Sequence, residues 1–272
     1  MTPPAHRLSV DFLQHSERQI FHILSQPEHG EAQGAVLFLH PFAEEMHKAQ
    51  RTVAAQARLL AAQGYMVMQI DLNGCGDSDG EFVDARWETW LEDANAALNY
   101  LRQHCAGPIT LWGLRLGALL ACELERTHTD IQRLVLWQPV LNGEQQVDQF
   151  LRLRVAAAAV GERPSFDRKT LWSELREGKT LEVAGYELSA ELAMAISKSR
   201  LHDLIPSCEV LWMEVTPGTG RELALPSRNV TAYWEDHGVQ VQAYALPGEA
   251  FWRNHDAAIN PDLLRLTLDG LR

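Results

Sequence analysis

The chain is poor in cysteine and in positive charge, and both shortages narrow what it can be. Its 272 residues include 4 cysteines, none in a C-x-x-C pair, so zinc ribbons and thioredoxin-like redox motifs have no support. Scattered thiols of this kind are typical of reduced cysteines rather than of a disulfide framework. With 24 Lys and Arg against 36 Asp and Glu, the formal net charge of -12 disfavours binding to nucleic-acid phosphates.

The chain also lacks a segment that would take it to or across a membrane. No apolar run approaches the roughly 18 residues of a membrane helix, and the first residues do not join a basic start to an apolar core. We therefore expect a cytoplasmic protein with no membrane insertion. No residue pattern points to a metal or a cofactor, and we expect neither.

What the chain does contain is an alternation of short apolar runs and amphipathic helices. Of its residues 46% are hydrophobic, enough for one large domain with a buried core. Continuous apolar runs predict strands buried on both faces, and helical spacing predicts the helices between them. The strands are expected at 35–40, 65–70, 109–112 and 134–137, and the helices around 53–61 and 87–101. This order predicts an α/β fold with a mostly parallel, doubly wound sheet.

The alternation stops near Asn142 and resumes only near residue 209. The stretch between is more charged, and it predicts helices over 146–160, 167–176 and 190–199 and a short strand over 180–186. Strands over 209–215 and 239–246 and a closing helix over 261–271 complete the pattern. We therefore expect a single domain with a core of residues 1–142 and 205–272 and an inserted helical lid of residues 143–204.

One motif has the frame of a known catalytic turn. The strand that ends at Trp112 is followed by Gly113-Leu114-Arg115-Leu116-Gly117 and then by a helix rich in small residues. In the G-x-S-x-G nucleophile elbow, the two glycines allow a sharp turn and the central side chain is exposed above the sheet. Here both glycines are present, but the centre is an arginine, which stays protonated and is no nucleophile at neutral pH.

Four segments together resemble the α/β-hydrolases, and most closely the exosortase A system-associated hydrolase 2 family. They are residues 40–46 (HPFAEEM), 74–78 (GCGDS), 112–118 (WGLRLGA) and 183–188 (VAGYEL), and the resemblance covers nearly the whole chain. It implies an α/β-hydrolase fold with an inserted lid, in a bacterial protein that accompanies exopolysaccharide and protein-sorting genes. It supplies no substrate.

The resemblance also implies roles for residues around the elbow. His40 would order the oxyanion loop, and the backbone N–H groups of Phe42 and Leu116 would be the oxyanion donors. Cys75 and Ser78, in the Gly-x-Gly-x-Ser turn, are the other candidate nucleophiles. Turns of this kind are usually structural, with glycine supplying positive φ and the serine hydroxyl bonded to the loop.

The other two positions of a catalytic triad also depart from the hydrolase pattern. Phe251 stands where the base histidine is expected, and His255, four residues further on, is a weak substitute that a surface position explains better. No carboxylate directly follows the strand over 209–215, and Glu222 is a distant replacement for the acid. Trp87 and Trp252 are either core residues or walls of a pocket.

Two interpretations of Arg115 stay open. A guanidinium at a helix start, together with backbone N–H groups, would bind an anion. Alternatively, Arg115 forms an internal ion pair with Glu44, Glu45 or Asp77. The matching functions are a hydrolase with a non-standard catalytic constellation, or a non-catalytic protein that binds an anionic small molecule or a partner protein. We expect a small-molecule ligand and no nucleic acid, and we leave a homodimer open.

Overall fold

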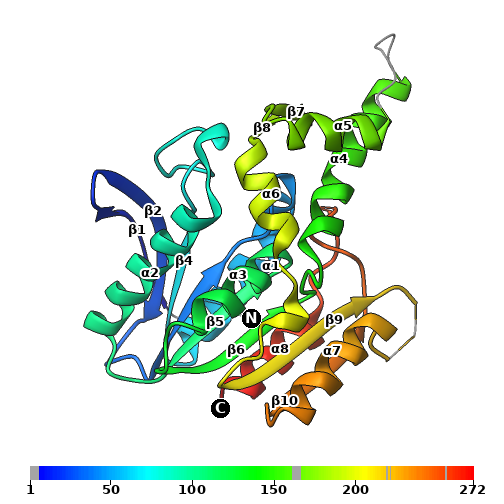
Figure 1. The fold of residues 1–272 in the computed structure, drawn as a ribbon. Helices are drawn as coiled ribbons and strands as arrows, with labels where there is room; N and C mark the ends of the chain where they lie inside the picture. Colours follow the sequence, from blue (N-terminus) through cyan, green and yellow to red (C-terminus); the bar gives the residue numbers. More distant parts are fainter. Residues whose placement is uncertain (1–5, 161–166, 219, 221, 255) are drawn as a thin grey trace.

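The apolar runs of the sequence form the centre of one eight-stranded sheet (Figure 1). The computed structural model describes residues 6–160, 167–218, 220, 222–254 and 256–272. The strand order is β1-β2-β4-β3-β5-β6-β9-β10, with the β1–β2 and β2–β4 pairs antiparallel and the other pairs parallel. The strands are β1 (His6–His15), β2 (Arg18–Pro27), β3 (Gly34–Leu39), β4 (Tyr65–Ile70), β5 (Ile109–Leu114), β6 (Ile131–Trp137), β9 (Glu209–Thr216) and β10 (Val241–Pro247).

The central strands are buried on both faces because their side chains alternate between two apolar cores. On β3, Leu37 and Leu39 belong to one core cluster, while Val36 and Phe38 belong to the other. This alternation is why a parallel strand in the middle of the sheet has a continuous apolar sequence. The expected α/β architecture, a mostly parallel sheet between helices, is confirmed.

Helices cover both faces of the sheet (Figure 1). The helices α1 (Glu44–Ala62) and α8 (Pro261–Leu271) pack into one core cluster, and α2 (Trp87–His104), α3 (Leu116–Glu125) and α7 (Leu225–Asp236) pack into the other. Among the described residues, none of the helices is long and apolar enough to cross a bilayer. The same residues contain no group of three or more His, Cys, Asp or Glu side chains arranged to hold a metal ion.

A helical insertion leaves the sheet after β6 and returns to it at β9. It contains α4 (Gly143–Val160), α5 (Arg168–Arg176), the hairpin β7 (Leu181–Val183) and β8 (Tyr186–Leu188), and α6 (Ala190–Lys198). Its two ends are joined at the base by a bridge between Asn142 and Arg200 and by the hydrogen bond from Gly143 N to Ser199 O, 3.0 Å. In Figure 1 the insertion, green to yellow, stands above one end of the sheet.

The structure corrects the sequence expectations in three places. The β1–β2 hairpin was not expected, because β1 is mostly exposed and so contains no continuous apolar run. Helix α7 was also not expected, because it buries only a narrow apolar stripe. The strand expected over 180–186 is in fact a hairpin, whose turn Ala184-Gly185 has φ of 51° and 88°. Positive φ at both turn residues is the geometry of a tight two-residue hairpin loop.

Gly113 provides a test of how β5 and α3 are packed. A Cβ atom at this position would meet the backbone of Ala118 and Gly117, which cannot move without shifting the helix. We expect Gly113→Ala to destabilise the protein by about 3 kcal/mol in urea unfolding, at the upper end for overpacking. The matched control is Gly220→Ala, where a Cβ meets nothing within 4 Å, and this variant should unfold like the wild type. Equal stability of the two variants would contradict the close packing.

Candidate functional site

Arg115 lies at the apex of the turn between β5 and α3. Its backbone has φ 56° and ψ -116°, a region that side-chain-bearing residues rarely occupy. Hydrogen bonds hold it there: its N–H donates to Trp137 O at 3.0 Å, and its carbonyl accepts from Ala118 N at 3.1 Å and Val140 N at 3.2 Å. The glycine frame therefore makes a strained strand-to-helix turn of the elbow type, with Arg115 at its centre.

The Arg115 side chain is buried between groups from three parts of the chain. Its Nε lies 3.2 Å from Glu45 Oε1 on α1, and its Nη2 donates to Gln146 Oε1 at 2.9 Å and to Gln149 Oε1 at 3.3 Å on α4. The Trp252 ring lies 5.6 Å from the guanidinium carbon, in cation–π range. The structure thus contains an internal ion pair with one of the three expected partners, and anion binding by Arg115 stays a prediction.

Burial governs the charge state of Glu45. Both side chains of the ion pair are only 10% exposed. Loss of hydration raises the pKa of the Glu45 carboxyl above its ordinary value, while the adjacent Arg115 opposes this rise. Burial of the Glu45 carboxylate without water is unfavourable for folding, and the attraction to the Arg115 guanidinium offsets part of this free energy.

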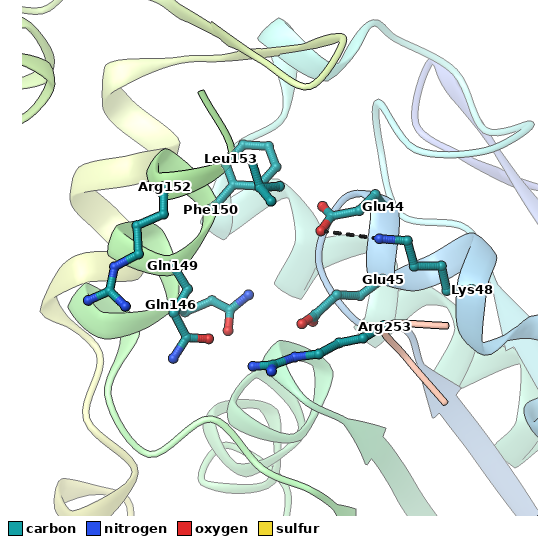
Figure 2. A pocket seen from close by; sticks show the side chains of 9 residues that line it. All are labelled: Glu44, Glu45, Lys48, Gln146, Gln149, Phe150, Arg152, Leu153 and Arg253. Atoms are coloured by element: carbon teal, nitrogen blue, oxygen red, sulfur yellow. Dashed lines mark ion pairs between the residues drawn. The ribbon is translucent and has the colours of Figure 1, made fainter. Parts of the chain in front are cut away.

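A polar pocket lies between α1 and α4, and Glu45 and the two glutamines that bond Arg115 are among its lining residues (Figure 2). Its volume is about 380 Å³, and Figure 2 shows Arg253 extending between Glu45 and the two glutamines. Lys48 lies 3.7 Å from Glu44, and Arg152 lies 3.2 Å from Asp148, whereas the exposed Arg253 side chain has no hydrogen bond or ion pair among the described residues. The lining residues are Glu44, Glu45, Lys48, Gln146, Gln149, Phe150, Arg152, Leu153 and Arg253.

His40 joins the two loops beside the elbow. Its Nδ1–H donates to Pro41 O at 2.8 Å, and its Nε2 accepts from Leu72 N–H at 3.2 Å. Burial lowers the pKa of His40, in agreement with a neutral ring that bridges two backbones. The N–H groups of Phe42 and Leu116 donate no hydrogen bond to any described residue, and both residues are buried beside a separate small cavity. Their role as oxyanion donors stays a prediction.

Hydrogen bonds and burial hold the residues of the turn that contains Cys75 and Ser78. The Ser78 hydroxyl donates to Asp71 O at 2.5 Å and accepts from Phe21 N at 2.8 Å. Burial raises the pKa of the Cys75 thiol far above its ordinary value, so its reactive thiolate is disfavoured. Asp77 is exposed and donates its N–H to the Asp71 carboxylate at 3.0 Å. This geometry supports structural roles for these residues.

The positions expected for a base and an acid contain other kinds of residue. Phe251 is buried and packs edge-on against Trp137, with ring centroids 5.9 Å apart. Glu222 is 85% exposed and lies 3.7 Å from Arg228, and His255 lies outside the described residues. Glu214, a buried carboxylate on β9, accepts from Trp212 Nε1 and Ala224 N, both at 3.1 Å, and so has a structural role.

Aromatic contacts connect the pocket to the rest of the insertion. Phe42 packs against Phe150 of α4 with centroids 5.0 Å apart, and Tyr186 of β8 packs against Phe82 at 5.0 Å. Trp87 lines a small cavity beside Phe42 and donates its Nε1–H to Glu123 at 3.0 Å. The oxyanion-loop segment and the hairpin segment of the sequence therefore belong to one packed cluster.

Sequence reasoning missed three residues of this site: Gln146, Gln149 and Arg253. The two glutamines are one helical turn apart, so they share a face of α4. That spacing was visible in the sequence, but it is equally typical of a solvated helix face.

No sequence pattern indicated that Arg253 belongs to the site, because it lies in an irregular segment with no helical or strand spacing.

The sheet, the elbow turn and the insertion define an α/β-hydrolase fold. The family model of the serine aminopeptidase S33 family matches residues 30–176, more than half of the chain, and the chain belongs to this family. No curated protein matches it.

Solved structures agree on the fold. Est1E from Butyrivibrio proteoclasticus, with ferulic acid bound, superposes with a TM-score of 0.63 at 17% identity over 96% of each chain. Proline iminopeptidase from Mycobacterium smegmatis gives 0.60 at 16% over 97% of each, and an alpha-beta serine hydrolase homologue from Coxiella burnetii gives 0.55 at 13% over 97% of each. At these identities the likeness shows the fold alone.

The ion pair predicts a pH-dependent loss of stability in Arg115→Ala. The Glu45 pKa is higher in the folded state than in the unfolded state. Ionisation of Glu45 therefore lowers the free energy of unfolding. This loss is absent below the unfolded-state pKa and develops as the pH rises through the folded-state pKa. Without Arg115 this loss is larger. We expect the stability gap to wild type to be smaller near pH 4, about the ordinary glutamate pKa, and to reach about 3 kcal/mol or more above neutral pH.

The measurement is urea unfolding across this pH range, with Arg115→Ala/Glu45→Gln as the matched control. The double variant leaves no carboxylate stranded, so the difference in stability between it and the single variant Glu45→Gln should not depend on pH. A gap that is independent of pH, or one that the second substitution does not reduce, would contradict the role of the Glu45 charge.

Proposed function

We propose that Arg115 replaces the elbow serine and that the protein binds an anionic small molecule in the pocket between α1 and α4, without serine chemistry. The observation that carries the proposal is the side chain at the apex of the elbow. It is a guanidinium fixed by Glu45 and two glutamines, at the place where a serine hydrolase needs a free hydroxyl.

The neighbouring groups support the loss of serine chemistry. A nucleophilic serine needs an adjacent base, and the position expected for that base holds the buried Phe251. The Ser78 hydroxyl has both a donor and an acceptor partner, and the Cys75 thiol is held protonated by burial. The described residues around the pocket therefore offer no activated hydroxyl or thiol.

Charge supports an anionic ligand. The chain has a net charge of -12, yet three of the pocket-lining residues are basic and two are acidic, and one of the two acidic residues, Glu45, is paired with the Arg115 guanidinium. A local excess of positive charge on an acidic protein concentrates anions at that place. Arg253 is the side chain best able to receive one, because no hydrogen bond or ion pair to a described residue fixes its guanidinium, although its charge also acts on Glu45.

We further propose that the protein belongs among the exosortase A system-associated hydrolases and works beside bacterial exopolysaccharide systems. The four resembling segments support this, and Phe42, Phe150 and Tyr186 bring two of them together at the pocket. Residues 143–204 would act as the lid of that pocket, since α4 contributes one of its walls. A cytoplasmic location accords with four cysteines that are all free.

A second candidate is hydrolysis without a serine nucleophile, and Glu45 favours it. Its carboxyl lines the pocket, and burial raises its pKa, which are the properties of a general acid. In this case the anion-binding groups would orient a substrate, and Glu45 would exchange the proton.

Activity-based labelling tests the loss of serine chemistry. A fluorophosphonate probe is expected to leave the elbow peptide unlabelled, and p-nitrophenyl esters to be turned over at no more than the buffer rate, because no activated hydroxyl is present. Arg115→Ser serves as a comparison that restores the hydroxyl without a base. Stoichiometric labelling of the wild type near the elbow would overturn the proposal, and ester turnover lost in Glu45→Gln would favour the second candidate.

Thermal melts in phosphate or short carboxylates test the anion site. Wild-type Tm should rise with anion concentration, because a ligand that binds only the folded state stabilises it. Arg253→Gln should weaken the apparent anion affinity by about tenfold, the loss of one charge-assisted hydrogen bond. The control is Arg228→Gln, an exposed arginine that does not line the pocket and should behave as wild type. A wild-type Tm insensitive to anions would exclude this binding.

A further inference from the structure

The outer edge of the sheet exposes an apolar stripe that the hydrolase fold does not explain. Strand β1 spans ten residues and pairs on one side only, with β2, so its other edge faces outward at the left of Figure 1. Leu8, Val10 and Phe12 are 59%, 56% and 47% exposed, and they account for three of the five large hydrophobic side chains exposed in the described chain. A long edge strand with exposed apolar side chains is a template for strand pairing.

The backbone pattern identifies which residues of β1 can pair outward. Phe12 lies opposite Phe21, whose N–H and carbonyl bond Ser78 and Asp71 on the far side of β2. In an antiparallel ladder, two directly opposite residues either both point their N–H and carbonyl groups toward each other or both point them away. Because those of Phe21 point away from β1, those of Phe12 point away from β2. The alternation along the strand gives Val10 and Leu8 the same outward orientation. The outward-facing N–H and carbonyl groups of the edge therefore include those of three apolar residues, and of these the Phe12 N–H donates to the Asp11 carboxylate in the single chain.

We propose that β1 pairs antiparallel with β1 of a second copy of this chain, about a twofold axis at Ser9. In this register Leu8 lies opposite Val10 of the second copy, and these two residues exchange backbone hydrogen bonds. Arg7 lies opposite Asp11, on both sides of the axis. The pairing joins the two eight-stranded sheets into one.

Charge selects this register over its neighbours. The outward-pointing N–H and carbonyl groups recur at every second residue, and they bond only when such residues lie opposite each other. The twofold axis of any alternative register must therefore pass through a residue and not between two residues. An axis at Val10 would place Arg7 opposite Leu13, and an axis at Asp11 would place Asp11 opposite itself. Only the axis at Ser9 forms two Arg–Asp pairs, and like charges directly opposite destabilise a ladder.

Both charged side chains are available for these pairs. Arg7 is exposed and bonds only through its Nε, to Pro27 O at 3.3 Å. Asp11 is exposed and accepts from the N–H of Phe12 at 2.8 Å, one of the outward N–H groups of the edge. In the pair of chains this N–H would bond to the second strand, and the Asp11 carboxylate would turn to Arg7 of the second copy.

A charge swap tests the pairing by sedimentation equilibrium of the full chain over a concentration series. Wild type is expected to form a dimer. Arg7→Asp and Asp11→Arg should each weaken it by about tenfold or more, because each places like charges opposite at two symmetric sites. Arg7→Asp/Asp11→Arg restores opposite charges and should return the affinity to within about threefold of wild type. Both positions are exposed, so the variants should melt like the parent.

Engineered cysteines check the register independently. Ser9→Cys places two thiols across the axis in a non-hydrogen-bonded pair, where the Cα separation suits a disulfide. Mild oxidation should therefore cross-link this variant between chains, while Ser16→Cys, an exposed serine in the hairpin turn, should stay uncross-linked. A monomer at every concentration overturns the proposal, and so does a dimer that neither single charge variant weakens.

Discussion

The buried ion pair between Arg115 and Glu45 is the interaction on which the pocket depends. It joins the elbow turn to the start of α1, and the hydrogen bonds from Arg115 to Gln146 and Gln149 extend the connection to α4. The guanidinium thus holds together the sheet, a helix of the core and the insertion. Because removal of one partner from a buried pair is far more costly than its formation is favourable, the three elements are tied to one another at this point.

The elbow turn owes its shape to its backbone and not to the side chain at its apex. Its backbone geometry is produced by the close approach of Gly113 and Gly117 to neighbouring chain and by hydrogen bonds of the Arg115 backbone. None of these contacts involves the side chain at the apex. The turn therefore forms whatever residue stands there, and the cost of positive φ is paid by the surrounding structure.

The sequence predicted the interior of this protein better than its edges. Runs such as residues 35–40 are apolar throughout because both faces are buried, and this signal is unambiguous. The glycine spacing around Arg115 was equally clear, since few other residues fit so tight a turn. Strand β1 gave no such signal, because its apolar residues alternate with polar ones and remain exposed in the single chain.

The site was only partly predictable, for a different reason. The Arg115–Glu45 pair joins positions 70 residues apart, and the sequence left Glu44, Glu45 and Asp77 as equal candidates. Their geometry separates them: Glu45 turns inward on α1, Glu44 turns to Lys48, and Asp77 stays exposed at the outer turn. Glu45 continues the buried stripe of α1 that contains Ala49, Val53 and Ala57, each one helical turn further on, and Glu44 does not. Helical spacing therefore separates the two glutamates, but only once the stripe that faces the sheet is extended back to the first turn of the helix.

The same network links the ligand pocket to the position of the insertion. The side chains that hold the Arg115 guanidinium from above, Gln146 and Gln149, also line the pocket, as does Glu45 from the opposite side. The ligand proposed for this pocket would therefore lie beside groups that already hold α4 against the elbow. A ligand that changed these hydrogen bonds would change the free energy of the contact between α4 and the elbow, and by linkage that contact would affect the affinity for the ligand. The side chain at the apex of the elbow thus bonds to both the core and the insertion, through Glu45 on one side and the two glutamines on the other.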